Sequence, residues 1–173
     1  MIRHMEFFPP SLELSLGSRI IDNFSDQFSF NLSIRNKNKK TYCQQLDNMV
    51  FKVSLSNSTA IIISDASIKN NIATSISHVH IANQLLIKML HHAVLVTTTE
   101  AKLFAIGCGI NQACSKDNIS KIIVITNSIH VAKKIFNTMS YPYQGQAVTI
   151  LSNLRQFFTR NQSNSIEFWK CLS

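Results

Sequence analysis

The 173-residue chain is poor in charged residues, which make up 15% of it against about a quarter in an average globular protein. It also lacks any apolar run close to the roughly 18 residues that cross a bilayer. Its first residues, Met1–Glu6, contain no apolar core of a secretory signal. We therefore expect neither a membrane-spanning nor a secreted protein, and the 45% of hydrophobic residues is enough for a globular one.

The cysteines lack the spacing of a zinc finger or of a redox pair. There are four of them, at Cys43, Cys108, Cys114 and Cys171. The simplest interpretation is a set of reduced thiols in an intracellular protein, cytoplasmic or nuclear. We also expect the protein to be a monomer.

What the chain does have is positive charge. The formal net charge is +8 and the isoelectric point is about 9.5. A basic surface favours phosphate backbones and other anionic surfaces, although modest basicity is also common in proteins with no such partner. Nucleic acid is therefore the partner that the charge favours.

The first third of the chain differs from the rest. Pro9-Pro10, Gly17 and the Asn- and Lys-rich stretch 35–40 are typical of irregular chain, and apolar periodicity is poor. We interpret residues 1–58 as a linker or tail, the remnant of an upstream polyprotein. Residues 59–173 form the domain.

From residue 60 the pattern becomes regular. Two continuous apolar runs predict buried strands, and alternating or mixed apolar segments predict further strands and amphipathic helices. The predicted strands are 60–66, 73–81, 86–96, 121–126 and 166–169, and the predicted helices follow Thr97 and cover 128–138 and 147–159. The two buried strands, linked through a helix, are expected to be parallel neighbours, while the first three strands form an antiparallel meander.

Each buried strand ends in a polar side chain that can bind metal. Asp65 ends the first, and Asn127 follows the second. In open α/β sheets the chemistry lies just beyond the carboxyl ends of such strands. We therefore expect a site around Asp65 and Asn127.

Four short motifs, in this order, resemble those of ribonuclease H domains. They are Ser64-Asp65-Ala66-Ser67, the helix opening Thr99-Glu100-Ala101-Lys102-Leu103-Phe104-Ala105-Ile106, the strand end Thr126-Asn127-Ser128, and the tail Ile166-Glu167-Phe168-Trp169-Lys170-Cys171. The tail is similar to the final strand of such domains in fungal retrotransposon polyproteins of the non-LTR type, where they follow a reverse transcriptase. The resemblance implies an α/β fold with a mixed five-stranded sheet, in the order β-β-β-α-β-α-α-β, and flanking helices.

The resemblance also implies a chemistry, hydrolysis of the RNA strand of RNA–DNA hybrids with two Mg²⁺ ions held by a carboxylate cluster. Of the catalytic positions, Asp65 matches and remains as the metal ligand. Lys102 stands where the family has Glu, and Asn127 where it has Asp. The fourth carboxylate either lies beyond Ser173, which would make the domain truncated, or is absent. We expect weak Mg²⁺ binding and an enzyme that is impaired or inactive, at most a weak nucleic-acid binder.

Other polar residues near these motifs are less clearly indicated as functional. Ser67, Ser128, His130 and Lys133 are candidates for nucleic-acid contact. For His130 a plain surface position is an equal alternative, and for Lys133 a solvated helix face is slightly favoured. Glu100 is expected to serve the first helical turn, since two residues on a helix rotate a side chain by about 200° away from position 102.

A pair of histidines and a second family resemblance give two further interpretations. His78 and His80 alternate on one strand and could bind metal, but no third ligand is at hand, so an exposed polar face is favoured. The strand ends also resemble the first two motifs of haloacid-dehalogenase-like phosphatases, with Asp65 as nucleophile. That family needs a second Asp where this chain has Ser67, and the meander after Asp65 fits it poorly.

Overall fold

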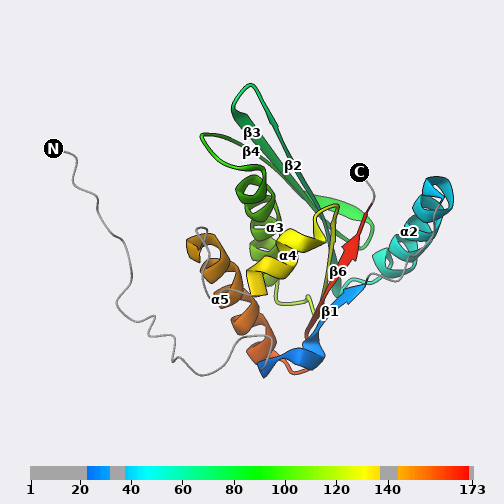
Figure 1. Ribbon diagram of the computed structural model, residues 1–173. Coiled ribbons are helices and arrows are strands. Elements are labelled where there is room, and N and C mark those ends of the chain that lie inside the picture. Colours follow the sequence, from blue (N-terminus) through cyan, green and yellow to red (C-terminus); the bar gives the residue numbers. More distant parts are fainter. Residues whose placement is uncertain (1–22, 32–37, 137–143, 172–173) are drawn as a thin grey trace, which may run out of the picture.

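The computed structural model describes residues 23–31, 38–136 and 144–171, which build a six-stranded mixed sheet flanked by helices (Figure 1). The strand order is β1-β6-β5-β2-β3-β4. The elements are η1 (Ser25–Gln27), β1 (Phe28–Asn31), α2 (Lys39–Ser54), β2 (Thr59–Lys69), β3 (Ile72–Ile81), β4 (Gln84–Val94), α3 (Thr98–Cys114), β5 (Lys121–Thr126), α4 (Ile129–Phe136), α5 (Gln144–Arg160) and β6 (Ser165–Lys170).

The parallel pairing of β2 with β5 is confirmed. The register runs from Thr59 opposite Lys121 to Ser64 opposite Thr126, and α3 lies in the connection between the two strands. Both strands are apolar on both faces because helices cover both sides of the sheet at this point. Asp65 and Asn127 are the next residues after the last pair, so both come to the same edge of the sheet.

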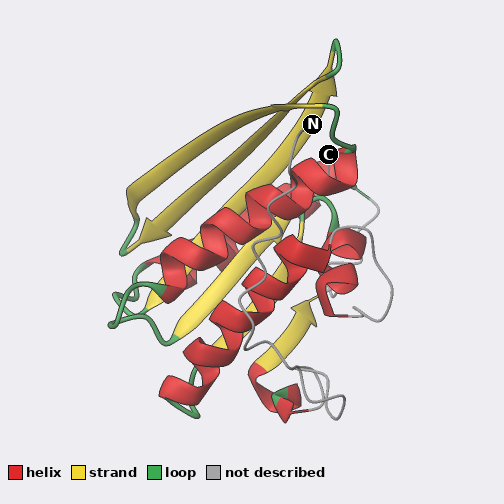
Figure 2. Ribbon diagram, turned by 90° about the vertical axis from the view of Figure 1, so that its left-hand side faces the viewer, coloured by secondary structure: helices red, strands yellow, loops and turns green. Residues whose placement is uncertain are grey.

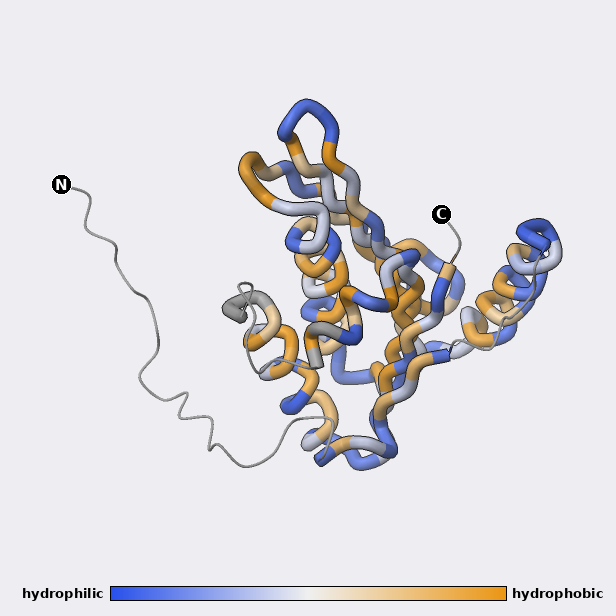
Figure 3. Tube along the Cα trace, in the orientation of Figure 1, coloured by the Kyte–Doolittle hydropathy of each residue, from blue (hydrophilic) through white to orange (hydrophobic). Residues whose placement is uncertain are grey.

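The meander of β2, β3 and β4 is antiparallel, as predicted. Its two turns, Asn70-Asn71 and Ala82-Asn83, have positive φ at both central residues, which is the geometry of the tight hairpins that match strand twist. Figure 3 shows the first of these turns as a hydrophilic tip. β4 ends two residues before the predicted boundary, because Leu95 turns to a φ of 59° and is 94% exposed.

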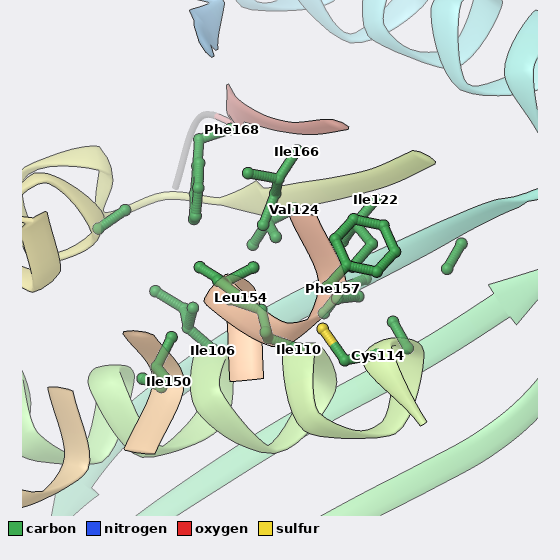
Figure 4. Packing of buried hydrophobic residues seen from close by; sticks show 14 of the residues in the cluster. Ile106, Ile110, Cys114, Ile122, Val124, Ile150, Leu154, Phe157, Ile166 and Phe168 are labelled. Atoms are coloured by element: carbon green, nitrogen blue, oxygen red, sulfur yellow. The ribbon is translucent and has the colours of Figure 1, made fainter. Parts of the chain in front are cut away.

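One face of the sheet is covered by α3, α4 and α5, which lie in front of the strands in Figure 2. Side chains from two of these helices and from β5 and β6 point toward one another in Figure 4 and form the main core. Its fully buried members include Ile106, Ile110, Ile122, Val124, Leu154, Phe157, Ile166 and Phe168. The predicted helix 128–138 is described as α4 up to Phe136, and its last two residues lie outside the described residues.

The prediction that residues 1–58 are irregular is wrong for much of the described part. β1 pairs in parallel with β6 and adds a sixth strand to the five predicted. The helix α2 lies on the face of the sheet opposite α3, α4 and α5 (Figure 1). Whether this range descends from an upstream polyprotein stays a prediction.

The contacts of α2 explain why it forms. Asn38 caps its first turn, accepting a hydrogen bond from the backbone N–H of Lys40. The buried hydroxyl of Tyr42 donates to the backbone carbonyl of Lys170 at the end of β6. The remaining apolar side chains of the helix pack against the sheet, with Leu46, Met49, Val50 and Val53 meeting Ile61, Ile123, Ile125 and Trp169.

Helix α3 packs so closely against the sheet that position 109 has no room for a side chain. A Cβ on Gly109 would lie 2.3 Å from Ile62 Cγ2 and 2.6 Å from Ser77 Oγ, both on strands. A Cβ on Gly107 would meet only the flexible end of Ile150, at 2.9 Å from Cδ1. The same helix therefore contains one glycine that packing requires and one that packing tolerates.

We predict opposite effects for the two Gly→Ala substitutions. Alanine stabilises a helix interior by about 1 kcal/mol relative to glycine, whereas overpacking a core costs about 1–3 kcal/mol. Gly109→Ala should lower the free energy of unfolding, and Gly107→Ala should leave it unchanged or raise it. Urea denaturation of both variants checks this, and equal stability of the two would contradict the packing shown here.

Candidate functional site

The site begins where β2 runs past the end of β5. Asp65 is exposed at this point, and its Oδ1 accepts a hydrogen bond from the backbone N–H of Ala66 at 2.8 Å. The side-chain nitrogen of Asn127 donates to the same oxygen at 3.2 Å. The two residues predicted to meet at this edge of the sheet are therefore in direct contact.

Lys102 reaches the same point from α3. The helix starts with a capping box in which Thr97 and Glu100 exchange hydrogen bonds, so Glu100 serves the first turn as expected. Lys102 lies one residue into the next turn and is half-buried. Its Nζ donates to Asn127 Oδ1 at 2.9 Å and to Ser128 Oγ at 2.8 Å.

Asn127 links the acidic and the basic side chain. Its amide nitrogen donates to Asp65 while its amide oxygen accepts from Lys102. Ser128 is 2% exposed, its hydroxyl donates to the same amide oxygen at 3.0 Å, and its backbone N–H donates to Thr126 Oγ1 at 3.2 Å. The four side chains of Asp65, Lys102, Asn127 and Ser128, here called the strand-end network, form one continuous set of hydrogen bonds.

The strand-end network does not fit a divalent metal. Mg²⁺ requires charged oxygen ligands, and Asp65 supplies the one carboxylate of the network. In the part of the chain that the structure describes, no group of three or more His, Cys, Asp or Glu side chains is placed to hold a metal ion. The ammonium of Lys102 would in addition repel a cation, by roughly 2 kcal/mol for a dication at about 4 Å in water and several-fold more where the site is shielded.

The other predicted contact residues lie apart from this network or at its border. Ser67 is exposed, two residues along β2 from Asp65, so it points to the same face of the sheet. His130 is exposed on α4. Lys133 is exposed as well, and its Nζ lies 5.4 Å from the ring centre of Phe30, a cation–π contact with β1.

Sequence reasoning missed the end of β6 as part of this region. Lys170 lies opposite Thr126, and the backbone N–H of Cys171 donates to the carbonyl of Thr126 at 3.0 Å. Burial raises the pKa of the Cys171 thiol, and the Asp65 carboxylate raises it further. The tail motif predicted a strand, but its place beside β5, which brings it to the site, needs the register of the sheet.

His78 and His80 lie on the face of β3 away from α3, with ring centres 6.3 Å apart. Burial lowers the pKa of His80 below its usual value, and the neighbouring His78 lowers it further. Nε2 of His78 is buried and has no hydrogen-bond partner. Among the described residues, no third His, Cys, Asp or Glu joins them to form a group that could hold a metal ion.

Comparison with known proteins identifies the fold. No protein-family model and no curated protein sequence matches the chain. Among solved structures, the N-terminal RNase H domain of a Mycobacterium tuberculosis protein, solved as a fusion with maltose-binding protein, is 16% identical with a TM-score of 0.55, covering 66% of this chain and 88% of that chain. The foamy viral protease–reverse transcriptase, in complex with an RNA/DNA hybrid, is 11% identical with a TM-score of 0.50, covering 70% of this chain and 18% of that chain.

At these identities the likeness establishes the fold, which is that of ribonuclease H. The predicted fold class is therefore confirmed, with one strand more than expected. Among the described residues no helix is long and apolar enough to cross a membrane. Since β2 continues into an antiparallel meander and Ser67 follows Asp65, nothing in this arrangement favours the phosphatase alternative.

The histidine pair predicts how stability changes with pH. The pKa of His80 is lower in the folded state than the usual value of about 6.5, so the unfolded chain binds more protons near that pH. The stability contributed by neutral His80 is therefore present above about pH 6.5 and is lost as pH falls through the lowered pKa. Melting temperatures measured from pH 7.5 to 5 should fall less steeply for His80→Gln than for the wild type. His130→Gln, at an exposed position of α4, is the control, and identical slopes for all three proteins would refute the prediction.

Proposed function

We propose that this chain is a ribonuclease H-like nucleic-acid-binding domain in which hydrolysis is impaired or lost. Its partner is an RNA–DNA hybrid or a related nucleic acid. The fold supports the class, since the foamy viral protein of like fold is described in complex with such a hybrid. The +8 net charge supports the partner, because neutralising phosphates with Lys and Arg drives nucleic-acid binding.

One observation supports the proposal that hydrolysis is impaired. Where two-metal hydrolysis needs a cluster of anionic oxygens, this site has an ammonium bonded to a neutral amide. Asn127 offers an oxygen to a cation, but that oxygen already accepts from Lys102 and Ser128. The strand-end network can orient a nucleic acid, but beside Asp65 it supplies no further carboxylate to hold the pair of metal ions that would activate water. Mg²⁺, the cofactor that the resemblance implies, would be bound weakly through Asp65.

The origin of the domain is part of the proposal. The tail and the order of the motifs support descent from the reverse-transcriptase polyprotein of a fungal non-LTR retrotransposon. We further propose that it acts as a monomer inside the cell, in the cytoplasm or the nucleus. Ser67, His130 and Lys133, which are exposed, remain proposed contacts to nucleic acid. Ser128, also predicted as a contact, is buried and holds Lys102 instead.

The first test is cleavage. With Mg²⁺ or Mn²⁺, the wild-type chain should cleave a labelled RNA–DNA hybrid no faster than a background set by Asp65→Asn, because the strand-end network holds one carboxylate. Gel analysis of the RNA strand over hours measures this. Robust metal-dependent cleavage that disappears in Asp65→Asn would overturn the proposed impairment.

The second test rebuilds the carboxylate cluster. Lys102→Glu combined with Asn127→Asp adds two carboxylates beside Asp65 and removes the ammonium, so Mg²⁺ should raise the melting temperature of this double variant. Binding stabilises a fold by about 1–3 kcal/mol when the ligand is at 10–100 times its Kd. The wild type and the variant Lys116→Glu, which lies beyond the far end of α3, should show no such rise. If the double variant does not respond to Mg²⁺ either, the site around Asp65 is misplaced.

A further inference from the structure

The strand-end network does not fit a divalent metal, but it already contains a cation, the ammonium of Lys102. The inference from this rests on the proposed nucleic-acid binding. We propose that Lys102 is the resident cation of the strand-end network and that its ammonium contacts a phosphate of the bound nucleic acid directly. Binding at this site then requires no divalent metal. The ligand group is a phosphodiester, presented by an RNA–DNA hybrid.

The ammonium is held in place and still has a donor to offer. A lysine ammonium carries three N–H donors, and two of them go to Asn127 Oδ1 and Ser128 Oγ at 2.9 and 2.8 Å. Lys102 is half-buried, so part of its side chain reaches solvent, and among the described residues no protein acceptor is found for its third donor. Ser128 is itself fixed by the bond from its backbone N–H to Thr126 Oγ1. A phosphate therefore meets a charge whose position is already set.

The charge balance of the site allows a phosphate to approach. Asp65 contributes one negative charge and Lys102 one positive charge, and the Asn127 amide couples them. Lys170, exposed at the end of β6, adds positive charge at the same edge of the sheet. The nearby carboxylate of Glu100 is bound to the backbone N–H of Thr97 at the start of α3. A cluster of carboxylates repels phosphate until metal ions neutralise it, whereas this site is neutral or positive as it folds.

The same geometry disfavours a divalent ion at the place that the ammonium occupies. The side chain that would have to leave is bonded to both Asn127 and Ser128, and its departure would leave the buried Ser128 hydroxyl with the amide oxygen as its remaining partner. Lysine and metal are therefore alternatives at one place. A metal-free mode of phosphate binding is the arrangement that these residues favour.

The experiment measures binding of the full chain to a fluorescently labelled RNA–DNA hybrid by anisotropy, in EDTA and in Mg²⁺ at matched ionic strength. Wild-type affinity should be the same within about two-fold in both buffers. Lys102→Met should weaken binding several-fold and reduce the slope of log K against log salt by about 0.7–0.9, the loss of one phosphate contact. Lys102→Arg should retain most of the slope, because it retains the charge.

Lys116→Met is the matched control, since it removes one exposed charge just beyond the C-terminal end of the same helix. It should leave the slope unchanged. Wild-type binding that disappears in EDTA overturns the inference without use of any variant. Equal slopes for Lys102→Met and Lys116→Met overturn it as well, while the proposed function survives if both bind in a salt-dependent way. No salt-dependent binding by the wild type would overturn the proposed function and this inference together.

Discussion

The parallel pairing of β2 with β5 is the constraint on which the other parts of the molecule depend. Apart from Ile63 and Lys121, the paired residues of both strands are buried, so each side of the sheet must be covered. The connection through α3 covers one side, and α2 together with Trp169 covers the other. Because the pairing ends at Ser64 and Thr126, the next residue of each strand comes to the same edge of the sheet. Asp65, in the part of β2 that continues past β5, and Asn127 therefore meet there without any contribution from a long loop.

At that edge the side-chain amide of Asn127 bridges the carboxylate of Asp65 and the ammonium of Lys102. A lysine and an aspartate placed at adjacent strand ends could form a simple ion pair, which at a surface is worth about 0–1 kcal/mol. Asn127 separates them and satisfies each with the matching end of its side chain. Asn127 also accepts the proton of the buried Ser128 hydroxyl, whose oxygen in turn accepts from Lys102. A buried donor left without an acceptor costs about 1–3 kcal/mol. The strand-end network is therefore specific in its residue types, and replacing Asn127 by an acidic or apolar side chain would leave one member unsatisfied.

Sequence reasoning reached most of the fold because the decisive signals were local. Continuous apolar runs identify β2 and β5, and the motif order identifies α3 and the strand ends. Helix α2 was missed although Tyr42, Leu46, Met49, Val50 and Val53 recur at helical spacing. Its polar residues and the Asn-Lys stretch before it outweighed that periodicity. β1 is four residues long and is stabilised by pairing with β6, far away in sequence, which no local pattern shows.

For the site, too, one part could be predicted from the sequence and another part depends on packing. Asp65 next to Asn127 follows from strand order, whereas the hydrogen bonds of Lys102 depend on a rotamer and on how α3 lies on the sheet. Sequence reasoning therefore saw Lys102 as a repelling charge but not as a donor.

A cluster of carboxylates can serve catalysis but lowers the stability of the native state, because the like charges repel one another until a bound cation neutralises them. The hydrogen-bonded set at the ends of β2 and β5 contains no such repulsion, since opposite charges and matched donors meet there. The strand-end network therefore adds to the stability of the fold at a place where clustered carboxylates would weaken it. Replacing Lys102 and Asn127 by acidic residues would cost the protein stability until a cation was bound.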